Sequence, residues 1–300
     1  MKRFDMHVHA QKTAPDPESL ITKLEDAGIY GCNVFSPRPI EADSRVGMKF
    51  SERIDRLHGW CNGYSDRLFP VLWVHPDEHF LKSKIRTAVS EGVVAFKVIC
   101  TDFYPYEKKC MRMLDAIAAE GKPVIFHSGI LWNGNDSSKY NRPLNFERLI
   151  EIDGLRFSLG HCSWPWVDEC IALYGKFLNG VTTGRTSEMF FDITPGTPPI
   201  YREELLTKLF TVGYDVPDNV MFGTDNRTDS YNSVWARKWQ TIDDEIYDKL
   251  GIDDGIREKI YSSNLMRFLG KREKDFQHLS PVPDREIVWS IKGGRGKELK

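Results

Sequence analysis

The chain has 300 residues, and its length, composition and charge already exclude several classes of protein. The 41 Lys and Arg residues and 43 Asp and Glu residues give a formal charge of −2, which argues against non-specific nucleic-acid binding because such binding needs a cationic excess. Apolar residues at 41% and aromatic residues at 12% supply enough core material to argue against a disordered chain.

The predicted secondary structure alternates between short apolar runs and longer amphipathic stretches. Strand-like runs are rich in Val, Ile and Phe, are bounded by Gly, Pro, Asn or Asp, and fall at 3–9, 29–35, 68–74, 92–99, 123–127, 156–161, 188–193 and 219–225. Helices are predicted between them, at 17–27, 77–90, 106–120, 143–152, 165–178 and 202–212, with two more within 230–269.

Eight strand–helix units in series predict a parallel sheet with right-handed crossovers, and eight is also the number that closes a (β/α)8 TIM-type barrel. We therefore expect an α/β fold with a single barrel domain at 1–270. An open doubly wound sheet is the rival fold, but no GxGxxG motif follows the first strand, as its dinucleotide-binding version would require. The remaining residues, 271–300, are expected to form a C-terminal extension.

The N-terminus and the cysteines indicate where the protein resides. Asp5, His7 and His9 interrupt the apolar stretch that a signal peptide would need, and no run approaches the roughly 18 apolar residues of a membrane span. The six cysteines form no CxxC pair, which favours reduced thiols. We expect a cytoplasmic protein that binds neither a membrane nor nucleic acid, and homo-oligomer formation stays open.

Residues that can bind a metal gather at the ends of the predicted strands. His7 and His9 end the first strand, His127 the fifth, His161 the sixth, and Asp225 the eighth. The active site of a barrel lies at these carboxyl ends, and two residues that are two apart on a strand point to the same face. A single histidine here is more often a satisfied core residue, but the combination favours a site for zinc or a similar divalent ion.

Four segments carry a resemblance to a known family: DMHVH at 5–9, VIFHSG at 124–129, FSLGHCSWPW at 157–166 and VMFGTDN at 220–226. The chain resembles the amidohydrolase superfamily over nearly its whole length. It is most similar to amidohydrolase-related family two, which includes enzymes like aminocarboxymuconate-semialdehyde decarboxylase. The chain departs from the family at 162–164, where the family often has glycines.

The resemblance implies a distorted barrel with one catalytic divalent metal ion. His7, His9 and His127 would be metal ligands, Asp225 a metal-proximal ligand and proton shuttle, and His161 a catalytic residue. Zn²⁺ is the ion we expect first, with Mn²⁺ or another divalent ion as the alternative.

Such a site predicts a metal-dependent hydrolase that uses a metal-activated water on an amide, lactone or ester of a small carbonyl compound. The alternative enzyme is a metal-dependent decarboxylase, a carbon–carbon lyase acting on a small unsaturated or aromatic carboxylate. A non-enzymatic binding scaffold and a binuclear phosphotriesterase-like enzyme are further alternatives. The binuclear enzyme would need a carboxylated Lys97 that bridges two ions.

Four further residues are candidates for contact with a small-molecule substrate: Lys97, Trp164, Arg185 and Arg227. Lys97 lies in the fourth strand, where the competing interpretation is an inward lysine paired with a carboxylate, because a buried unpaired ammonium is costly. Trp164 follows the sixth strand. Arg185 and Arg227 are assigned to loops on the catalytic side, as is Arg38, and an arginine there can hold a carboxylate with two hydrogen bonds.

Overall fold

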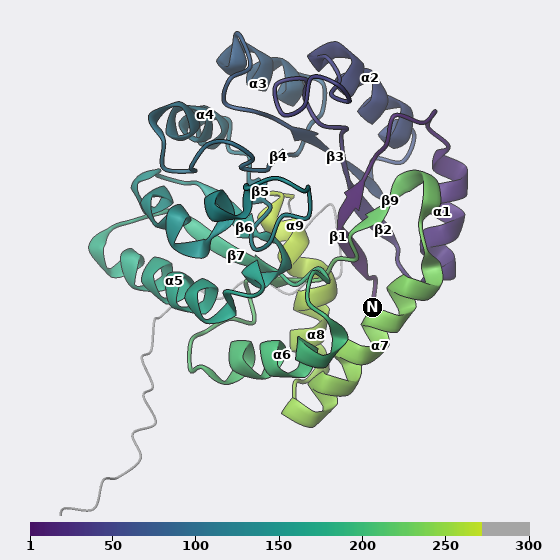
Figure 1. Ribbon diagram of the computed structural model, residues 1–300. Helices are drawn as coiled ribbons and strands as arrows, with labels where there is room; N and C mark the ends of the chain where they lie inside the picture. Colours follow the sequence, from purple (N-terminus) through teal and green to yellow (C-terminus); the bar gives the residue numbers. More distant parts are fainter. Residues whose placement is uncertain (272–300) are drawn as a thin grey trace, which may run out of the picture.

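A computed structural model describes residues 1–271 and contains one sheet of nine parallel strands (Figure 1). The predicted extension at 271–300 lies outside the described residues apart from Lys271. Along the sheet the strands follow the order β8-β7-β6-β5-β4-β3-β2-β1-β9. Their bounds are Phe4–His9 (β1), Gly31–Phe35 (β2), Leu68–Trp73 (β3), Ala95–Val98 (β4), Val124–Phe126 (β5), Arg156–Leu159 (β6), Glu188–Asp192 (β7), Val220–Met221 (β8) and Asn226–Arg227 (β9).

The two ends of the sheet come from one short segment, and this closes the barrel. The predicted strand 219–225 is observed only as β8, which pairs with β7, whereas β9 begins just after the predicted range and pairs with β1 at Val8 and His9. Between them the N–H of Met6 donates to the carbonyl of Phe222 at 3.0 Å, which joins β1 directly to the residue after β8. The barrel prediction is therefore confirmed over the open sheet.

Helices α1 to α7 lie around the outside of the sheet, and α9 lies at the centre of the view (Figure 1). Their bounds are Pro17–Asp26 (α1), Phe50–Cys61 (α2), Leu81–Ser90 (α3), Lys108–Ala119 (α4), Val167–Gly180 (α5), Arg202–Thr211 (α6), Ser233–Leu250 (α7), Asp254–Glu258 (α8) and Asn264–Phe268 (α9). The predicted helix at 143–152 is a 3₁₀ helix, Pro143–Glu151.

Helix α2 is missing from the predicted elements. Its buried residues Ile54, Leu57 and Trp60 are three apart, which is the helical periodicity that would have revealed it. No helix among residues 1–271 is long and apolar enough to cross a membrane. All six cysteines are buried and unpaired.

The interior of the barrel changes from apolar to polar along its axis. At the amino ends of the strands, side chains such as Phe69, Ala95 and Ile125 form an apolar cluster against α9, which lies at the centre of the view in Figure 1. Toward the carboxyl ends, the buried side chains are charged or polar, among them His7, Lys97, His127, His161 and Asp192. Burying such groups is costly unless they are partnered, so this end of the barrel is the candidate site.

Candidate metal centre

Two histidines of β1 and one aspartate of the β8–β9 connection bring their ligand atoms together. The rings of His7 and His9 are 5.1 Å apart between centroids. Asp225 Oδ1 lies 3.3 Å from His9 Nε2 and 3.7 Å from His7 Nε2. Each of the three side chains offers a ligand atom within 4.8 Å of the others. Two imidazole nitrogens and one carboxylate oxygen are a donor set that suits zinc and similar divalent ions.

The buried carboxylate of Asp192 fixes the ring of His7. His7 Nδ1 donates to Asp192 Oδ2 at 2.6 Å, and the N–H of Thr194 donates to Asp192 Oδ1 at 2.9 Å. Burial lowers the pKa of His7 well below its usual value, so the imidazole is neutral and its Nε2 keeps a lone pair. A carboxylate that holds the far nitrogen in this way orients a metal-binding imidazole and increases its basicity.

The other two predicted histidines lie next to this group. The ring of His161 is 5.3 Å from that of His7, and the ring of His127 is 5.1 Å from that of His161. His161 Nδ1 donates to the carbonyl of Thr194 at 3.2 Å, and His127 Nε2 donates to the carbonyl of Ile130 at 3.2 Å. Each ring therefore keeps one free nitrogen, Nε2 in His161 and Nδ1 in His127. Either nitrogen is available as a third donor or as a catalytic group.

Asp225 also has an electrostatic reason to remain ionised. Burial on its own raises the pKa of this carboxyl, but the hydrogen bond with His9 and the neighbouring imidazoles His7 and His161 hold the pKa well below its usual value. Burial lowers the pKa of His9 as well. Neutral imidazoles beside an ionised carboxylate are the protonation states that bind a cation.

The backbone at two of these positions adopts conformations that L-residues rarely take. His161, Cys162 and Ser163 have φ angles of 60°, 45° and 59°, and Asp225 has a φ of 59°. Such residues cost on the order of 1–3 kcal/mol each and cluster at functional sites. A Cβ on Gly196 would lie 2.7 Å from His161 Cγ, so only glycine lets the ring reach this position.

Asp5, which the sequence analysis does not include among the site residues, joins β1 to the segment that carries Asp225. Its carboxylate accepts hydrogen bonds from the N–H of His7 at 3.0 Å, the N–H and hydroxyl of Thr224 at 2.9 and 2.5 Å, and the hydroxyl of Tyr231 at 2.9 Å. Burial raises the pKa of Asp5 to about 7 although these bonds lower it. The clamp sets the position of Asp225 relative to β1. The only feature of the sequence that points to Asp5 is its position two residues before His7.

Lys97 is fully buried in the barrel, but it is not paired with a carboxylate. Its Nζ lies 3.4 Å from His7 Nε2 and 4.9 Å from the ring centroid of Phe35. Within residues 1–271, no carboxylate oxygen lies within 4.0 Å of this Nζ. The interpretation of Lys97 as a lysine paired with a carboxylate is therefore wrong. Burial lowers the pKa of Lys97 to about 8, although the charges of Asp192 and Asp225 raise it. Lys97 thus lies against the metal-binding candidates.

A cavity of about 520 Å³ opens beside His9 and Asp225. Arg227 lines it and is in register with His9 in the β1–β9 pair, so their side chains leave the sheet on the same face. This volume is typical of a site for a small molecule. The other lining residues come from the first four strands and the connections after them: Ala10, Gln11, Lys12, Ser36, Pro37, Arg38, Val46, Trp73 and Ile99.

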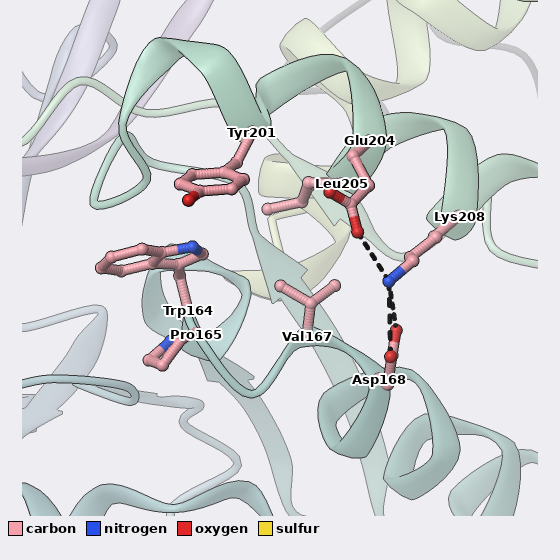
Figure 2. A pocket seen from close by; sticks show the side chains of 8 residues that line it. All are labelled: Trp164, Pro165, Val167, Asp168, Tyr201, Glu204, Leu205 and Lys208. Atoms are coloured by element: carbon pink, nitrogen blue, oxygen red, sulfur yellow. Dashed lines mark hydrogen bonds and ion pairs between the residues drawn. The ribbon is translucent and has the colours of Figure 1, made fainter.

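Trp164 borders a separate and smaller hollow of about 260 Å³ between α5 and α6 (Figure 2). Its ring faces that of Tyr201, with centroids 5.9 Å apart and planes tilted by 36°. At the other end of the hollow, Lys208 forms ion pairs with Asp168 at 3.0 Å and Glu204 at 2.8 Å (Figure 2). The structure therefore places Trp164 away from the lining of the larger cavity.

Arg185 lies at the opposite end of the barrel. It precedes β7, and its N–H donates to the carbonyl of Gly180 at the end of α5. In a parallel barrel a residue that precedes a strand lies at the amino end, far from the carboxyl ends that carry His9 and Asp225. We therefore remove Arg185 from the substrate-binding candidates, because its loop was assigned to the wrong end of the strand.

A second group of potential ligands, His75, Asp77 and Asp102, is already engaged in hydrogen bonds. His75 Nε2 donates to Asp102 Oδ1 at 3.2 Å, and His75 Nδ1 accepts from the N–H of Asp77 at 3.3 Å. Lys109 pairs with Asp77 at 2.8 Å. Both ring nitrogens of His75 are therefore occupied, which leaves His7, His9 and Asp225 as the better metal site.

Comparisons with known proteins identify the family and the fold of the chain. An amidohydrolase family model, that of amidohydrolase-related family two, matches residues 5–271. No curated protein matches the chain. The crystal structure of a putative amidohydrolase from Staphylococcus aureus aligns with a TM-score of 0.62 at 12% identity, covering 90% of this chain and 100% of that one.

Two further solved structures share the fold. A dihydroorotase from Campylobacter jejuni aligns with a TM-score of 0.57 at 14% identity, covering 90% of this chain and 84% of that one. Amidohydrolase 2 from Bifidobacterium longum subsp. infantis aligns with a TM-score of 0.54 at 15% identity, covering 91% and 100%. Because the family model spans nearly all of the described residues, the chain belongs to the amidohydrolase superfamily, in amidohydrolase-related family two.

Proposed function

We propose that this protein is a metal-dependent hydrolase that acts on an amide, lactone or ester of a small carbonyl compound. The observation that carries the proposal is the convergence of His7, His9 and Asp225, of which His9 and Asp225 line a cavity of about 520 Å³. Zn²⁺ is the first candidate for the ion. A bound divalent ion lowers the pKa of water toward neutrality and polarises a carbonyl oxygen.

The chain's own residues supply the remaining parts of a hydrolytic site. His7 and His9 would hold the ion, with Asp192 fixing the ring of His7. Asp225 is partly exposed to the cavity, so it can take a proton from an attacking water and return it to the leaving group. His161 Nε2 is free to hydrogen-bond the reacting carbonyl. His127 supplies the third nitrogen donor in this proposal.

A decarboxylase is the second candidate, and one observation favours it. Lys12, Arg38 and Arg227 line the same cavity, and cations there suit a substrate that carries a carboxylate. Turnover in ¹⁸O-labelled water separates the two reactions, since hydrolysis incorporates ¹⁸O into the product acid. Release of CO₂ without ¹⁸O incorporation would instead select the decarboxylase.

The metal assignment is tested by elemental analysis of the purified protein. We expect about one equivalent of a divalent ion per chain in the wild type. His9→Ala removes a donor and should lower the ion content by most of that equivalent. His58→Ala is the matched control, because His58 is a histidine of α2 that bonds Glu91 and lies outside the group. Equal ion content in both variants would remove His9 from the site.

Asp192→Asn should weaken metal binding by about 10- to 100-fold without removing any ligand. The carboxylate accepts from both His7 Nδ1 and the N–H of Thr194, whereas an amide can accept only one of these bonds. The conflict turns or retautomerises the ring of His7. Competition titration with a chelator measures the affinity, and Asp168→Asn, an exposed carboxylate on α5, should leave it unchanged. An unchanged affinity in Asp192→Asn would contradict the orienting role.

A further inference from the structure

The larger cavity concentrates positive charge in a protein whose overall charge is slightly negative. Three of its lining residues, Lys12, Arg38 and Arg227, are cationic, and Asp225 is the carboxylate that faces them. Within residues 1–271, no carboxylate oxygen lies within 4.0 Å of the side-chain nitrogens of Lys12 or Arg227. A hollow lined mainly by one sign of charge focuses the field and attracts ligands of the opposite sign.

Arg38 lies over an aromatic ring and leaves most of its hydrogen-bonding edge unused. Its guanidinium carbon lies 5.6 Å from the ring centroid of Trp73. The carboxylate nearest to it, that of Asp43, is 3.7 Å from Nη1 and also pairs with Arg45. A guanidinium over a ring can still donate in its own plane to a planar oxyanion.

The backbone that carries the Trp73 ring is fixed by buried hydrogen bonds. Buried Arg53 of α2 donates to the carbonyl of Trp73 and pairs with buried Glu78 at 2.6 Å. Glu78 also accepts from the N–H of His75 at 3.1 Å, which fixes the turn after β3. The part of the cavity wall that faces Arg38, at Trp73, is therefore preorganised, and an anion bound beside it loses less free energy to ordering that wall.

Arg227 of β9 lines the same cavity as Arg38. It is in register with His9, so its side chain starts beside a metal-binding candidate and reaches into the same cavity. We propose that Arg38 and Arg227, with Lys12, form an oxyanion subsite that selects substrates with a carboxylate or phosphate group apart from the reacting carbonyl. This inference rests on the proposed function, because it takes the cavity beside His9 and Asp225 to be the substrate site.

Calorimetric titration tests the subsite without any turnover. The probes are benzene-1,3-dicarboxylate, benzoate, benzamide and inorganic phosphate, added to the full-length protein. We expect the dianions to bind, benzoate to bind more weakly, and benzamide not to bind. Arg38→Ala and Arg227→Ala should each weaken dianion binding by about tenfold or more. The tighter of dicarboxylate and phosphate identifies the oxyanion that the substrate carries.

Arg185→Ala is the matched control, because it removes the same charge at the opposite end of the barrel and should change the affinity less than twofold. Arg227→Lys should recover part of the affinity, which a purely structural role would not predict. Benzamide binding as tightly as the dicarboxylate, or both alanine variants within twofold of the wild type, would overturn the subsite.

Elemental analysis of the same preparations separates this inference from the proposed function. Protein that binds no divalent ion but still binds dianions through Arg38 and Arg227 would retain the subsite and refute the metal-dependent hydrolase. Protein that holds its ion but fails to bind dianions would refute the subsite and leave the metal-dependent hydrolase standing. Circular dichroism of each variant confirms folding, which both exposed arginines should leave intact.

Discussion

His161→Ala is expected to lower kcat by a factor of about 10² or more while most of the divalent ion stays bound. The ring of His161 lies 5.3 Å from that of His7, and Thr194 holds its Nδ1, so Nε2 is left to act on substrate. It is outside the group of His7, His9 and Asp225 whose ligand atoms lie within 4.8 Å of one another. Steady-state kinetics together with elemental analysis of the same preparation measures both effects.

His127→Ala is the variant with which His161→Ala is compared, because it removes a predicted ligand. As the third predicted ligand, His127 should be needed for both the ion and turnover, so its replacement should reduce the two together. Loss of the ion from His161→Ala with retention in His127→Ala would mean that the two histidines have exchanged roles. Full activity in both variants would remove them from the site.

Asp243→Ala is expected to lower the free energy of unfolding by about 3–5 kcal/mol, because it leaves a buried guanidinium without its partner. Arg202 and Asp243 are both buried and share two hydrogen bonds, Nε to Oδ1 at 2.7 Å and Nη2 to Oδ2 at 2.6 Å. Arg202 also donates to the carbonyl of Ile193 at 2.7 Å. Ile193 directly follows Asp192, so the same pair supports the backbone behind His7.

Denaturant unfolding followed by circular dichroism measures this loss. The control is Glu203→Ala, which breaks an exposed ion pair with Lys249 at 2.8 Å between α6 and α7, the helices that also carry the buried pair. Exposed pairs contribute about 0–1 kcal/mol, so this variant should unfold near the wild-type midpoint. Equal midpoints for the two variants would show that the buried pair contributes no more than the exposed one.

Local pattern was enough to predict most of the barrel. Strands such as 68–74 and helices such as 17–27 differ from their observed bounds by a residue or so at either end. The early end of β8 at Met221 and the separate strand β9 were not predictable, because they depend on where Phe222 meets Met6 of β1. Helix α2 is absent from the predicted elements although the spacing of Ile54, Leu57 and Trp60 indicates a helix.

Some features of the candidate site follow from the sequence, and others need the structure. The pair His7 and His9 and the position of Asp225 at a strand end are properties of short segments, so the sequence points to them directly. Arg185 precedes the predicted strand 188–193, and the structure confirms that this strand starts at Glu188, so its place at the amino end of β7 follows from the sequence as well. The unpaired state of Lys97 depends on how far Asp192 and Asp225 lie from its Nζ, which the sequence does not encode locally.

By itself the sequence determined the order of strands and helices, the strand ends that carry imidazoles and a carboxylate, and the membership of a metal-dependent superfamily. The tertiary structure alone decided which nitrogen of each ring is free, which carboxylate supports His7, and which cations share a cavity. Periodicity and strand ends arise from neighbouring residues. Contacts such as that between His7 and Asp192, 185 residues apart, exist only once the barrel has closed.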